Sequence, residues 1–393
     1  MKEGWEYRKL GEICDFRSGF AFKSNKFTKI GEPIIRISDI QNEEIDDSNL
    51  VYFDPKSYTE DLSKYLIYPD DILIAMSGGT TGKIGINTSN RTYYLNQRVG
   101  VFRENKKYLN HRYLFYFLHT KSEESLKIAA GAAQPNLSTA QIKSFLIPVP
   151  SLSEQQSIVD YLDSAFAKID AMEANAEKAL NEAKALFQAS LKEMLEPKEG
   201  WVTSTLKDEC YKITDGTHQT PKYYPSGYIF LSSRNVTSRK IDWEDVKFID
   251  ESQHQLMYKR VAPQVGDILL AKNGTTGVAA MVDRDVVFDI YVSLALLRSR
   301  GNVTPEYLLA FVNSPIAKEQ FDKRLIGMGV PNLHLGEINQ VVITYPQDKV
   351  EQIRMTQRIE ELDCLIIRLQ ENYDKISQEC DVLKQAILRQ VFE

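Results

Sequence analysis

Cysteine is scarce and scattered in this 393-residue sequence, and long apolar runs are absent. The cysteines Cys14, Cys210, Cys364 and Cys380 form no CxxC pair, which argues against a zinc site and fits reduced thiols. No apolar run approaches the roughly 20 residues that span a bilayer. The opening residues, MKEGWEYRKL, lack the apolar core of a signal peptide, so we expect a cytoplasmic protein without a membrane anchor.

Motifs that carry catalysis are also missing. The sequence contains no HExxH, no GxSxG and no GxGxxG after a strand, and its five histidines are isolated from one another. Pro69-Asp70 with Glu104 and Lys106 has the residue types of a metal-dependent nuclease site. The second half of the chain has Val265-Gly266 at the position of Pro69-Asp70, and triplets of this kind are common, so we disfavour that interpretation. We expect no catalytic residue, no bound cofactor and no metal site in this chain.

The net charge of −6 is unevenly distributed along the sequence. Residues 1–150 carry 20 basic and 18 acidic side chains, and residues 197–346 carry 17 of each. The acidic excess lies in residues 151–196, with 4 basic and 9 acidic side chains, and in residues 347–393, with 7 and 10. Because phosphate contacts need Lys and Arg, only the two large segments are candidates for binding nucleic acid.

One phrase occurs twice, 196 residues apart: DILIAMSGGTTGKIG starts at Asp71 and DILLAKNGTTGVAA starts at Asp267. The same spacing relates the two KEGW phrases that end at Trp5 and Trp201, and relates QPNLS to VPNLH. Several matches in one register indicate a tandem repeat of a large unit. A period of this length is far beyond that of a solenoid, so each copy can form its own domain.

The repeated phrase resembles a phosphate-binding loop only superficially. Ser77 replaces the first glycine of that motif, Ile84 replaces its final Ser or Thr, and Val278 replaces Lys83 in the second copy. We interpret the phrase as a tight turn between two strands, in which Gly79, Gly82, Gly274 and Gly277 supply positive φ angles. Such a turn could present the hydroxyls of Thr80, Thr81, Thr275 and Thr276 to a ligand.

The two large segments are predicted to be mixed α/β. Strand candidates in the first are PIIRISDI, DILIAM, KIGI and QRVGVF, and their counterparts are YIFLSSRNV, DILLAK, VAAMV and VSLALL. Each set is followed by a helical stretch, from His111 and from Pro305, and then by an exit marked by proline. We therefore predict domains at residues 1–150 and 197–346, and helical spacer regions at 151–196 and 347–393.

The two acidic segments have the 3-4 spacing of coiled-coil helices. The predicted seam of the second segment is Ile359, Leu362, Ile366, Leu369, Tyr373, Ile376, Cys380, Leu383 and Ile387. That of the first is Val159, Leu162, Phe166, Ile169, Ala176, Leu180, Ala183 and Phe187, with Glu173 as an interruption that Met172 fills. Ser153 with Gln156 is a candidate N-cap, and Pro197 ends the run.

The order of globule, long helix, globule, long helix has a geometric consequence. A helix of about 40 residues spans roughly 60 Å. To bury its seam against the first helix, the second must run back along it, so we predict an antiparallel coiled coil and a pseudo-two-fold chain with its globules at opposite ends.

These features together resemble the specificity subunits of Type I restriction–modification enzymes. The resemblance rests on GWEYRKLGEICDFRSGFAFKS and GWVTSTLKDECYKITDGTHQTP at the two starts, the paired DILIAMSGGTTG and DILLAKNGTTG phrases, QPNLS and VPNLH, the exit prolines and the heptad helices. It covers essentially the whole chain. It implies two target-recognition domains that each read half of a bipartite DNA site, and helices that fix the half-site separation. It also implies a non-catalytic chain that docks two methyltransferase (modification) subunits, to which motor-nuclease subunits are added, with S-adenosylmethionine, ATP and magnesium on those partners.

Candidate base-reading residues are polar side chains in loops, since such groups pair with base edges. The candidates are Arg36, Ser38, Thr80, Thr81, Lys83, Gln134, Asn136, His218, Arg234, Asn235, Lys272, Asn273, Thr275, Thr276, Asn332 and His334. The two segments differ strongly outside the shared phrases, so the half-sites should differ in sequence. The alternative is a scaffold without DNA binding that presents two protein- or sugar-binding modules on a coiled coil, and neighbouring methyltransferase and helicase genes would discriminate against it. A self-contained nuclease or methyltransferase is disfavoured for lack of motifs.

Overall fold

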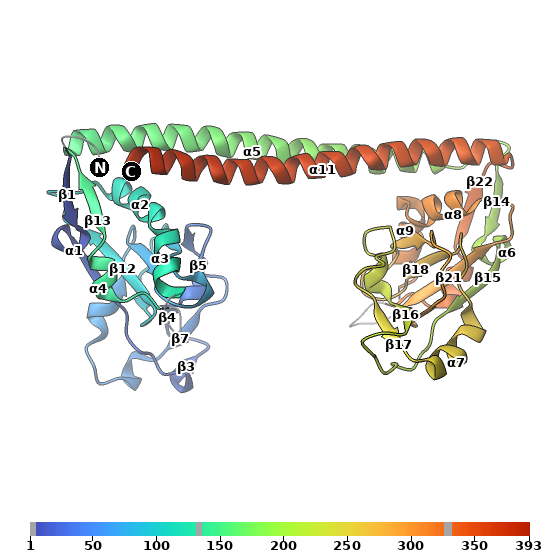
Figure 1. Ribbon diagram of the computed structural model, residues 1–393, viewed down its shortest axis with the longest axis horizontal. Coiled ribbons are helices and arrows are strands. Elements are labelled where there is room, and N and C mark those ends of the chain that lie inside the picture. Colours follow the sequence, from blue (N-terminus) through green and yellow to red (C-terminus); the bar gives the residue numbers. More distant parts are fainter. Residues whose placement is uncertain (1–4, 131–135, 326–331) are drawn as a thin grey trace. The chain divides into compact units, whose positions relative to one another are not determined.

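The computed structural model describes residues 5–130, 136–325 and 332–393. The chain forms two compact units: residues 1–175 with 375–393, and residues 176–374. Each unit contains one mixed α/β domain together with part of each of two long helices, α5 (Leu152–Leu195) and α11 (Lys349–Phe392) (Figure 1). The predicted fold class, two repeated α/β domains and two long helices, is confirmed.

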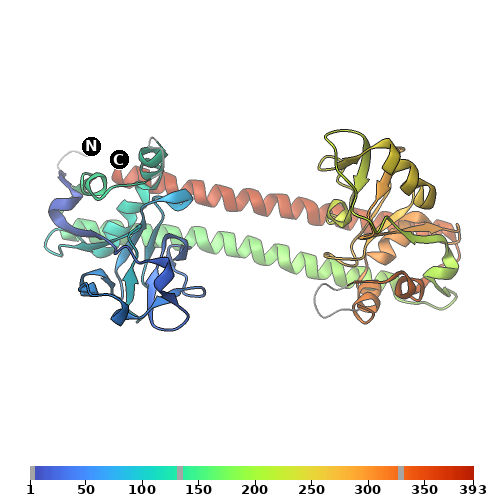
Figure 2. The same cartoon turned by 90° about the horizontal axis from the view of Figure 1, so that it is seen from below.

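The first unit has two large sheets, coloured blue to teal in Figure 2, besides a two-stranded ribbon. The six-stranded sheet has the order β2-β12-β9-β10-β6-β5, with bounds Cys14–Ser18, Val99–Glu104, Ile72–Ala75, Ile84–Ile86, Glu44–Ile45 and Ile40–Gln41. The five-stranded sheet has the order β3-β7-β4-β11-β8, with bounds Phe27–Thr28, Val51–Phe53, Glu32–Ile35, Tyr93–Leu95 and Leu66–Ile67. The short and medium helices are α1 (Leu10–Ile13), α2 (His111–Thr120), α3 (Ser122–Ala130) and α4 (Thr139–Lys143).

The second unit repeats this plan in a shorter form. Its first sheet has the order β15-β21-β18-β19, with bounds Cys210–Asp215, Leu294–Ser299, Ile268–Ala271 and Ala279–Met281. Its second sheet has the order β17-β16-β20, with bounds Lys247–Ile249, Tyr228–Leu231 and Phe288–Ile290. The helices are α6 (Leu206–Glu209), α7 (Glu251–Val261), α8 (Pro305–Val312), α9 (Pro315–Asp322) and α10 (Leu335–Asn339). The predicted strands, and the predicted helices from His111 and Pro305, are therefore confirmed.

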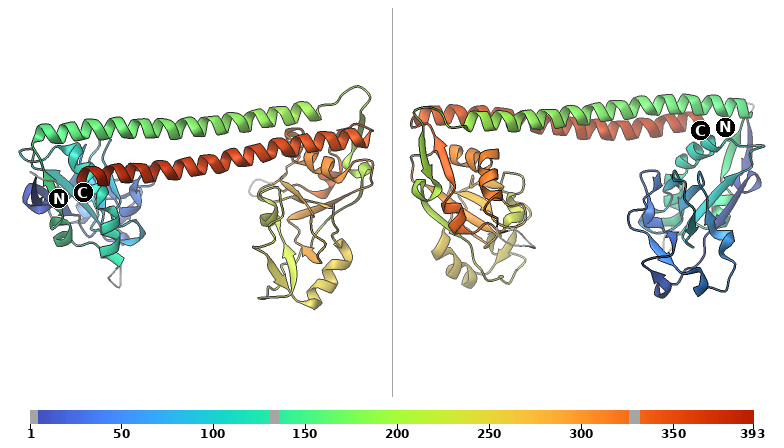
Figure 3. Two further views of the ribbon diagram at one scale, coloured as in Figure 1. Left: turned by 45° about the horizontal axis from the view of Figure 1, so that its top comes forward. Right: turned by 180° about the vertical axis from the view of Figure 1, so that it is seen from behind.

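The cores of both units combine sheet, helix and coiled coil. In the first unit α2 contacts β10 and shares one core with β9 and β12, and its Tyr113 and Phe117 contact Phe392 at the end of α11. Figure 3 shows these last turns of α11 beside α2. In the second unit Tyr307 of α8 lies in one core with Leu191 of α5. The long helices thus belong to the hydrophobic cores of the domains and are not merely attached to them.

Each domain begins and ends in a two-stranded antiparallel ribbon. β1 (Glu6–Lys9) pairs with β13 (Leu146–Val149), and β14 (Val202–Thr205) pairs with β22 (Val342–Tyr345). A buried glutamine then fixes the start of each long helix. Gln155 Nε2 donates to the Pro150 carbonyl at 2.9 Å, and Gln352 Nε2 donates to the Pro346 carbonyl at 2.9 Å. In both units the first strand of the domain is therefore paired with the strand that leads to the exit proline.

The two long helices pack antiparallel within each unit. In the first unit Lys384 contacts Asp170 at 2.6 Å and Ser377 donates to Glu173, and in the second unit Lys184 donates to Gln370 at 2.7 Å. The predicted antiparallel pairing is confirmed.

The seam prediction is correct for most positions of α5 and needs correction elsewhere. Met172 is 62% exposed and does not fill the gap; Glu173 itself occupies the seam and accepts from Ser377. In α11, Leu369 and Leu383 are 41% and 47% exposed, so they do not belong to the seam. The polar neighbours Gln370 and Lys384 make the interhelical contacts instead.

The helix ends also differ in detail from the prediction. Ser151, and not Ser153, caps α5, since its Oγ accepts the Glu154 N–H at 3.3 Å. α5 ends at Leu195, two residues before Pro197, because the residue before a proline is disfavoured in the helical conformation. Across the described ranges, no helix combines the length and apolarity that a membrane crossing requires.

Candidate nucleic-acid interface

The glycine phrase forms the turn between two antiparallel strands in both units, as predicted. It links β9 to β10 in the first unit and β18 to β19 in the second. Positive φ angles occur at Gly82, Gly274 and Gly277, as expected. In the first turn the other positive φ belongs to Gly78, at 76°, and not to Gly79. A strand follows the turn where a phosphate loop would have a helix, so the turn interpretation is correct.

The aspartate at the start of the phrase has a structural role that the sequence did not reveal. Asp71 accepts two hydrogen bonds from Arg103, at 2.9 and 2.6 Å, and one from the Tyr68 N–H at 2.7 Å. Asp267 accepts equivalent bonds from Arg298, both at 2.7 Å, and from the Gln264 N–H at 2.8 Å. Both aspartates are buried. The repeated aspartate of the phrase therefore forms a repeated buried ion pair.

In each unit the glycine turn pairs with the Asn-Leu residues of the repeated PNL phrase, Asn136-Leu137 and Asn332-Leu333. This phrase lies about 60 residues further along the chain. Ser77 pairs with Asn136, and Asn273 pairs with Asn332, as isolated antiparallel bridges. The Leu137 N–H donates to the Met76 carbonyl at 2.7 Å, and the Leu333 N–H donates to the Lys272 carbonyl at 3.0 Å. The structure thus brings together two sets of candidate residues from separate motifs. Gln134 lies outside the described residues.

The candidate side chains around these bridges divide into accessible and engaged groups. Lys83, Asn136, Thr275 and His334 are exposed. Thr81 is 1% exposed and its hydroxyl donates to the Gly78 carbonyl at 2.7 Å, so it stabilises the turn. Thr276 donates to the Lys272 carbonyl at 3.3 Å. The side-chain oxygens of Thr80, Asn273 and Asn332 are buried and have no hydrogen-bond partner among the described residues.

A second pair of candidate groups lies after β4 and β16, in matching 3-10 turns. Arg36 contacts Asp39 through its guanidinium at 3.3 Å, and Ser38 Oγ donates to the same carboxylate at 2.7 Å. In the second unit Asn235 occupies the position equivalent to Asp39. It is buried, and its Nδ2 donates to the carbonyls of Asp242, at 3.3 Å, and Asp245, at 2.9 Å. Asn235 therefore closes a loop. Arg234, next to it, is exposed and better placed for a ligand.

The most charged candidate cluster is in the second unit, around the buried carboxylate of Asp215. Lys272 Nζ lies 2.6 Å from one oxygen, and Arg260 Nη2 and His218 Nε2 lie 2.7 and 3.3 Å from the other. Burial opposes ionisation of Asp215, but the hydrogen bonds from Lys272 and His218 outweigh it and lower its pKa below the usual 3.8. Lys272 is 4% exposed and serves this ion pair, so direct base contact by Lys272 is unfavourable.

Arg260 and His218 are the accessible members of this cluster. Their side chains are 52% and 63% exposed, and both line a cavity of about 410 Å³ between the segment 217–221 and α7. Lys272 and Arg260 together exceed the charge of Asp215, so the rim is suited to an anionic group such as a phosphate. Sequence reasoning missed Arg260, because nothing in a helix that ends in KRV identifies the arginine that contacts a distant aspartate. Met76 replaces Lys272 and Ser18 replaces Asp215 in the first unit, which therefore lacks this cluster.

The disfavoured nuclease residues do lie near one another. Asp70, Glu104 and Lys106 line a cleft of about 760 Å³ in the first unit. Glu104, however, accepts from His111 Nδ1 at 3.0 Å, and Asp71 is committed to Arg103. Within the described residues no three His, Cys, Asp or Glu side chains are grouped so that they could hold a metal ion.

Comparisons with known proteins agree with this architecture. The family model described as "Type I restriction modification DNA specificity domain" matches residues 2–182. The chain is 25% identical, over its whole length and 89% of the relative, to the Type I restriction enzyme EcoKI specificity subunit of Escherichia coli K12. It is 29% identical, over 56% of this chain and 48% of the relative, to the StySPI specificity subunit of Salmonella potsdam.

Two solved structures share the fold across nearly the whole chain. One, from work on complex assembly and conformational transition of the type I R-M system, has a TM-score of 0.72 at 19% identity and covers 99% of this chain and 97% of its own. The HsdS subunit from Thermoanaerobacter tengcongensis has a TM-score of 0.54 at 18% identity, with coverage of 99% and 97%.

Proposed function

The chain belongs to the DNA specificity subunits of Type I restriction–modification systems, and we propose that each of its two units reads one half of a bipartite, asymmetric DNA site. The observation that carries this proposal is the repetition of a complete set of elements. Each unit has its own entry ribbon, glycine turn, PNL bridge and share of the coiled coil. A chain with two such units can match the two-fold geometry of duplex DNA and still read different half-sites.

The accessible candidates differ between the units, which supports different half-sites. The first presents Lys83 and Asn136, with Arg36 partly held by Asp39. The second presents Arg234, His218 and Arg260. Arginine and asparagine make bidentate contacts to guanine and adenine, respectively, so a difference in these side chains changes which base edges are matched.

We propose further that the long helices set the distance between the half-sites and dock two methyltransferase subunits. The chain itself would be non-catalytic. S-adenosylmethionine, ATP and magnesium would be bound by the methyltransferase and motor-nuclease subunits, which act on DNA in the cytoplasm. Near-neutral domains support this division, because few uncompensated Lys and Arg remain for phosphate contacts and a partner must supply further basic surface.

A chimera tests the assignment of one unit to one half-site. Residues 200–346 are replaced by the matching segment of a relative, so that the ribbon β14–β22 is transferred whole and both long helices are retained. With the native modification subunit, sequencing of methylated sites should show one half of the site changed, the other half kept and the same gap. A matched chimera of residues 1–150 should change the opposite half.

Two results would contradict the proposal. If both halves change together in either chimera, the two units read DNA jointly. If the methylation pattern of the host is unchanged when the gene is deleted, the chain is a scaffold that does not bind DNA.

A further inference from the structure

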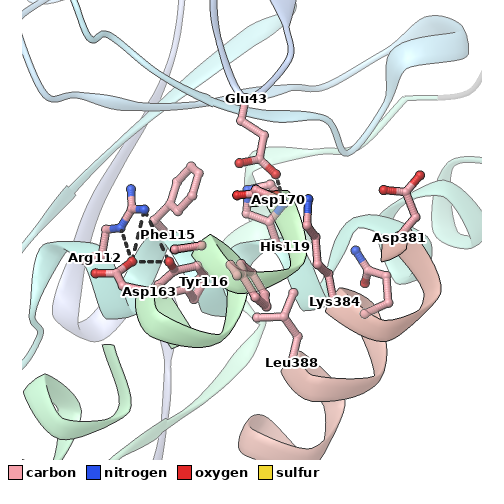
Figure 4. A pocket seen from close by; sticks show the side chains of 13 residues that line it. Glu43, Arg112, Phe115, Tyr116, His119, Asp163, Asp170, Asp381, Lys384 and Leu388 are labelled. Carbon is pink, nitrogen blue, oxygen red and sulfur yellow. Dashed lines mark hydrogen bonds and ion pairs between the residues drawn. The ribbon is translucent and has the colours of Figure 1, made fainter. Parts of the chain in front are cut away.

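Each unit has a cavity at the junction between its domain and the long helices, and we call these the first and second junction pockets. The first, of about 650 Å³, lies between α2, the start of α5 and the end of α11 (Figure 4). The second, of about 460 Å³, lies between α8, the end of α5 and the start of α11. Each pocket lies within one unit.

The two pockets are built from matching positions of the repeat. Tyr113 and Tyr307 anchor the short helices in the same way, since their hydroxyls donate to the carbonyls of Pro148 and Thr344 at 3.0 and 2.9 Å. Gln155 and Gln352 anchor the long helices. Counting along each helix from these anchors gives the equivalent positions of the two units. Arg112 is equivalent to Glu306, Asp163 to Glu360 and Leu388 to Leu191, and all six residues line the pockets.

The charged residues of the first pocket give it an acidic excess. Four carboxylates line it: Glu43, Asp163, Asp170 and Asp381. Two basic groups line it: Arg112 and Lys384. Asp163 lies 3.2 Å from Arg112 and Asp170 lies 2.6 Å from Lys384, so both basic groups are neutralised inside the pocket. Burial lowers the pKa of His119, which also lines it and is therefore mostly neutral at pH 7. Two negative charges remain.

The second pocket keeps this excess although individual charges are reversed. Four carboxylates line it: Asp283, Glu306, Glu360 and Asp363. Two basic groups line it: Arg239 and Lys240. Where the first pocket has Glu43 and Arg112, the second has Arg239 and Glu306, so acid and base exchange places and the sum is unchanged. Only one acid–base contact is close, Arg239 to Asp363 at 3.7 Å.

An acidic cavity of this kind repels the phosphate backbone, so DNA is not its occupant. A basic side chain fits it better. The carboxylates would receive the charged end, and apolar walls, formed by Phe115 and Leu388 in one pocket and by Leu309 and Leu191 in the other, would cover the aliphatic stem. Because the pocket occurs at the same place in both units, the occupant is expected in two equivalent copies.

We propose that the two junction pockets are equivalent docking sites for a Lys- or Arg-bearing segment of the modification subunit, one copy in each. This inference rests on the proposed function, in which two modification subunits bind one chain. It adds the location of the contacts and the charge of the partner's segment. It also separates the docking surface, which is acidic, from the glycine-turn surfaces assigned to DNA.

Charge reversal at matching positions tests the inference. Asp163→Lys and Glu360→Lys are made singly and together, with Asp163→Asn and Glu360→Gln as milder variants in case a reversal prevents folding. Glu177→Lys and Glu371→Lys are the controls: these exposed residues lie on the same two helices, carry the same charge change and line neither pocket. The number of modification subunits per full-length chain is measured by native mass spectrometry, and their affinity by titration.

The wild-type chain and both controls should bind two modification subunits. Each single reversal should weaken one site by at least tenfold and yield a complex with one, and the double reversal should bind none. The neutral variants should weaken the same sites less. If every pocket variant keeps two subunits at wild-type affinity, the junction pockets are not the docking sites, although the proposed function stands. If the wild-type chain binds no modification subunit, the proposed function fails first.

Discussion

The length of the coiled coil should determine the gap between the half-sites, and the contacts between the helices show where to lengthen it. The pair Glu173–Ser377 lies on one side of a short stretch and the pair Lys184–Gln370 on the other. Four residues inserted after Ala176 and four after Tyr373 fall between these two pairs. Both pairs can therefore re-form, and the insertion adds matched length to both helices.

The expected change follows from helix geometry. Four residues add about 6 Å at 1.5 Å per residue, and 400° of rotation, which is about 40° beyond one full turn. At about 3.4 Å per base pair this corresponds to a gap longer by about two base pairs. The inserted segments can repeat Ala176–Ala179 and Gln370–Tyr373, which already form helix in this protein.

Sequencing of methylated sites in cells that carry the lengthened chain is the assay. The two half-site sequences should be unchanged, and the gap should increase. A matched insertion of two residues is the control, since about 200° of rotation turns the seam away from its partner and should abolish methylation. An active four-residue variant with the original gap would refute the role of the helices as a ruler.

Four further outcomes are expected. The purified chain alone should bind DNA weakly and neither methylate nor cleave it in gel-shift and radiolabel assays; activity without partners would contradict the non-catalytic role. Asp71→Ala should lower the free energy of unfolding of the first unit by about 2–4 kcal/mol, since it strands the Arg103 guanidinium, whereas Asp15→Ala, in the exposed pair with Arg17, should change little in the same urea titration. The contribution of Asp215 should be complete above its ordinary pKa of 3.8 and lost as the pH falls through its lowered folded value, so Asp215→Asn should flatten the acid limb of a plot of urea midpoint against pH. Burial raises the pKa values of Cys14 and Cys210 to about 12 and shields Cys380, so a thiol reagent at pH 8 should react quickly with Cys364 alone and with all four cysteines after denaturation.

The elements that could be predicted from the sequence are those specified by local periodicity or by repetition. The 3-4 spacing predicts helices that end within a few residues of the observed bounds, and short apolar runs that precede a turn place β9 and β18 correctly. Glycine spacing predicts the turns, although the positive φ moves from Gly79 to Gly78. These features depend on neighbours in the sequence, which a single sequence displays.

The features that escaped prediction depend on partners distant in the sequence. Arg103 and Asp71 are 32 residues apart, and Arg260 reaches Asp215 from another element. A heptad count favoured Leu369 over Gln370, because it weighs polarity and cannot show that Lys184 offers a donor opposite. Asn235 has the residue type of a base reader, yet its amide is consumed by the Asp242 and Asp245 carbonyls.

Polar groups in the helical seam have a consequence for alignment. Leucines slide past one another at modest cost, because one apolar contact replaces another after a shift of seven residues. Here such a shift would separate Ser377 from Glu173 and Gln370 from Lys184 at once, and would withdraw Phe392 from the ring of Tyr113. A few polar groups at seam positions lower the stability of a coiled coil but select one alignment among several. A coiled coil built in this way gives up some stability and gains a single alignment of its two helices.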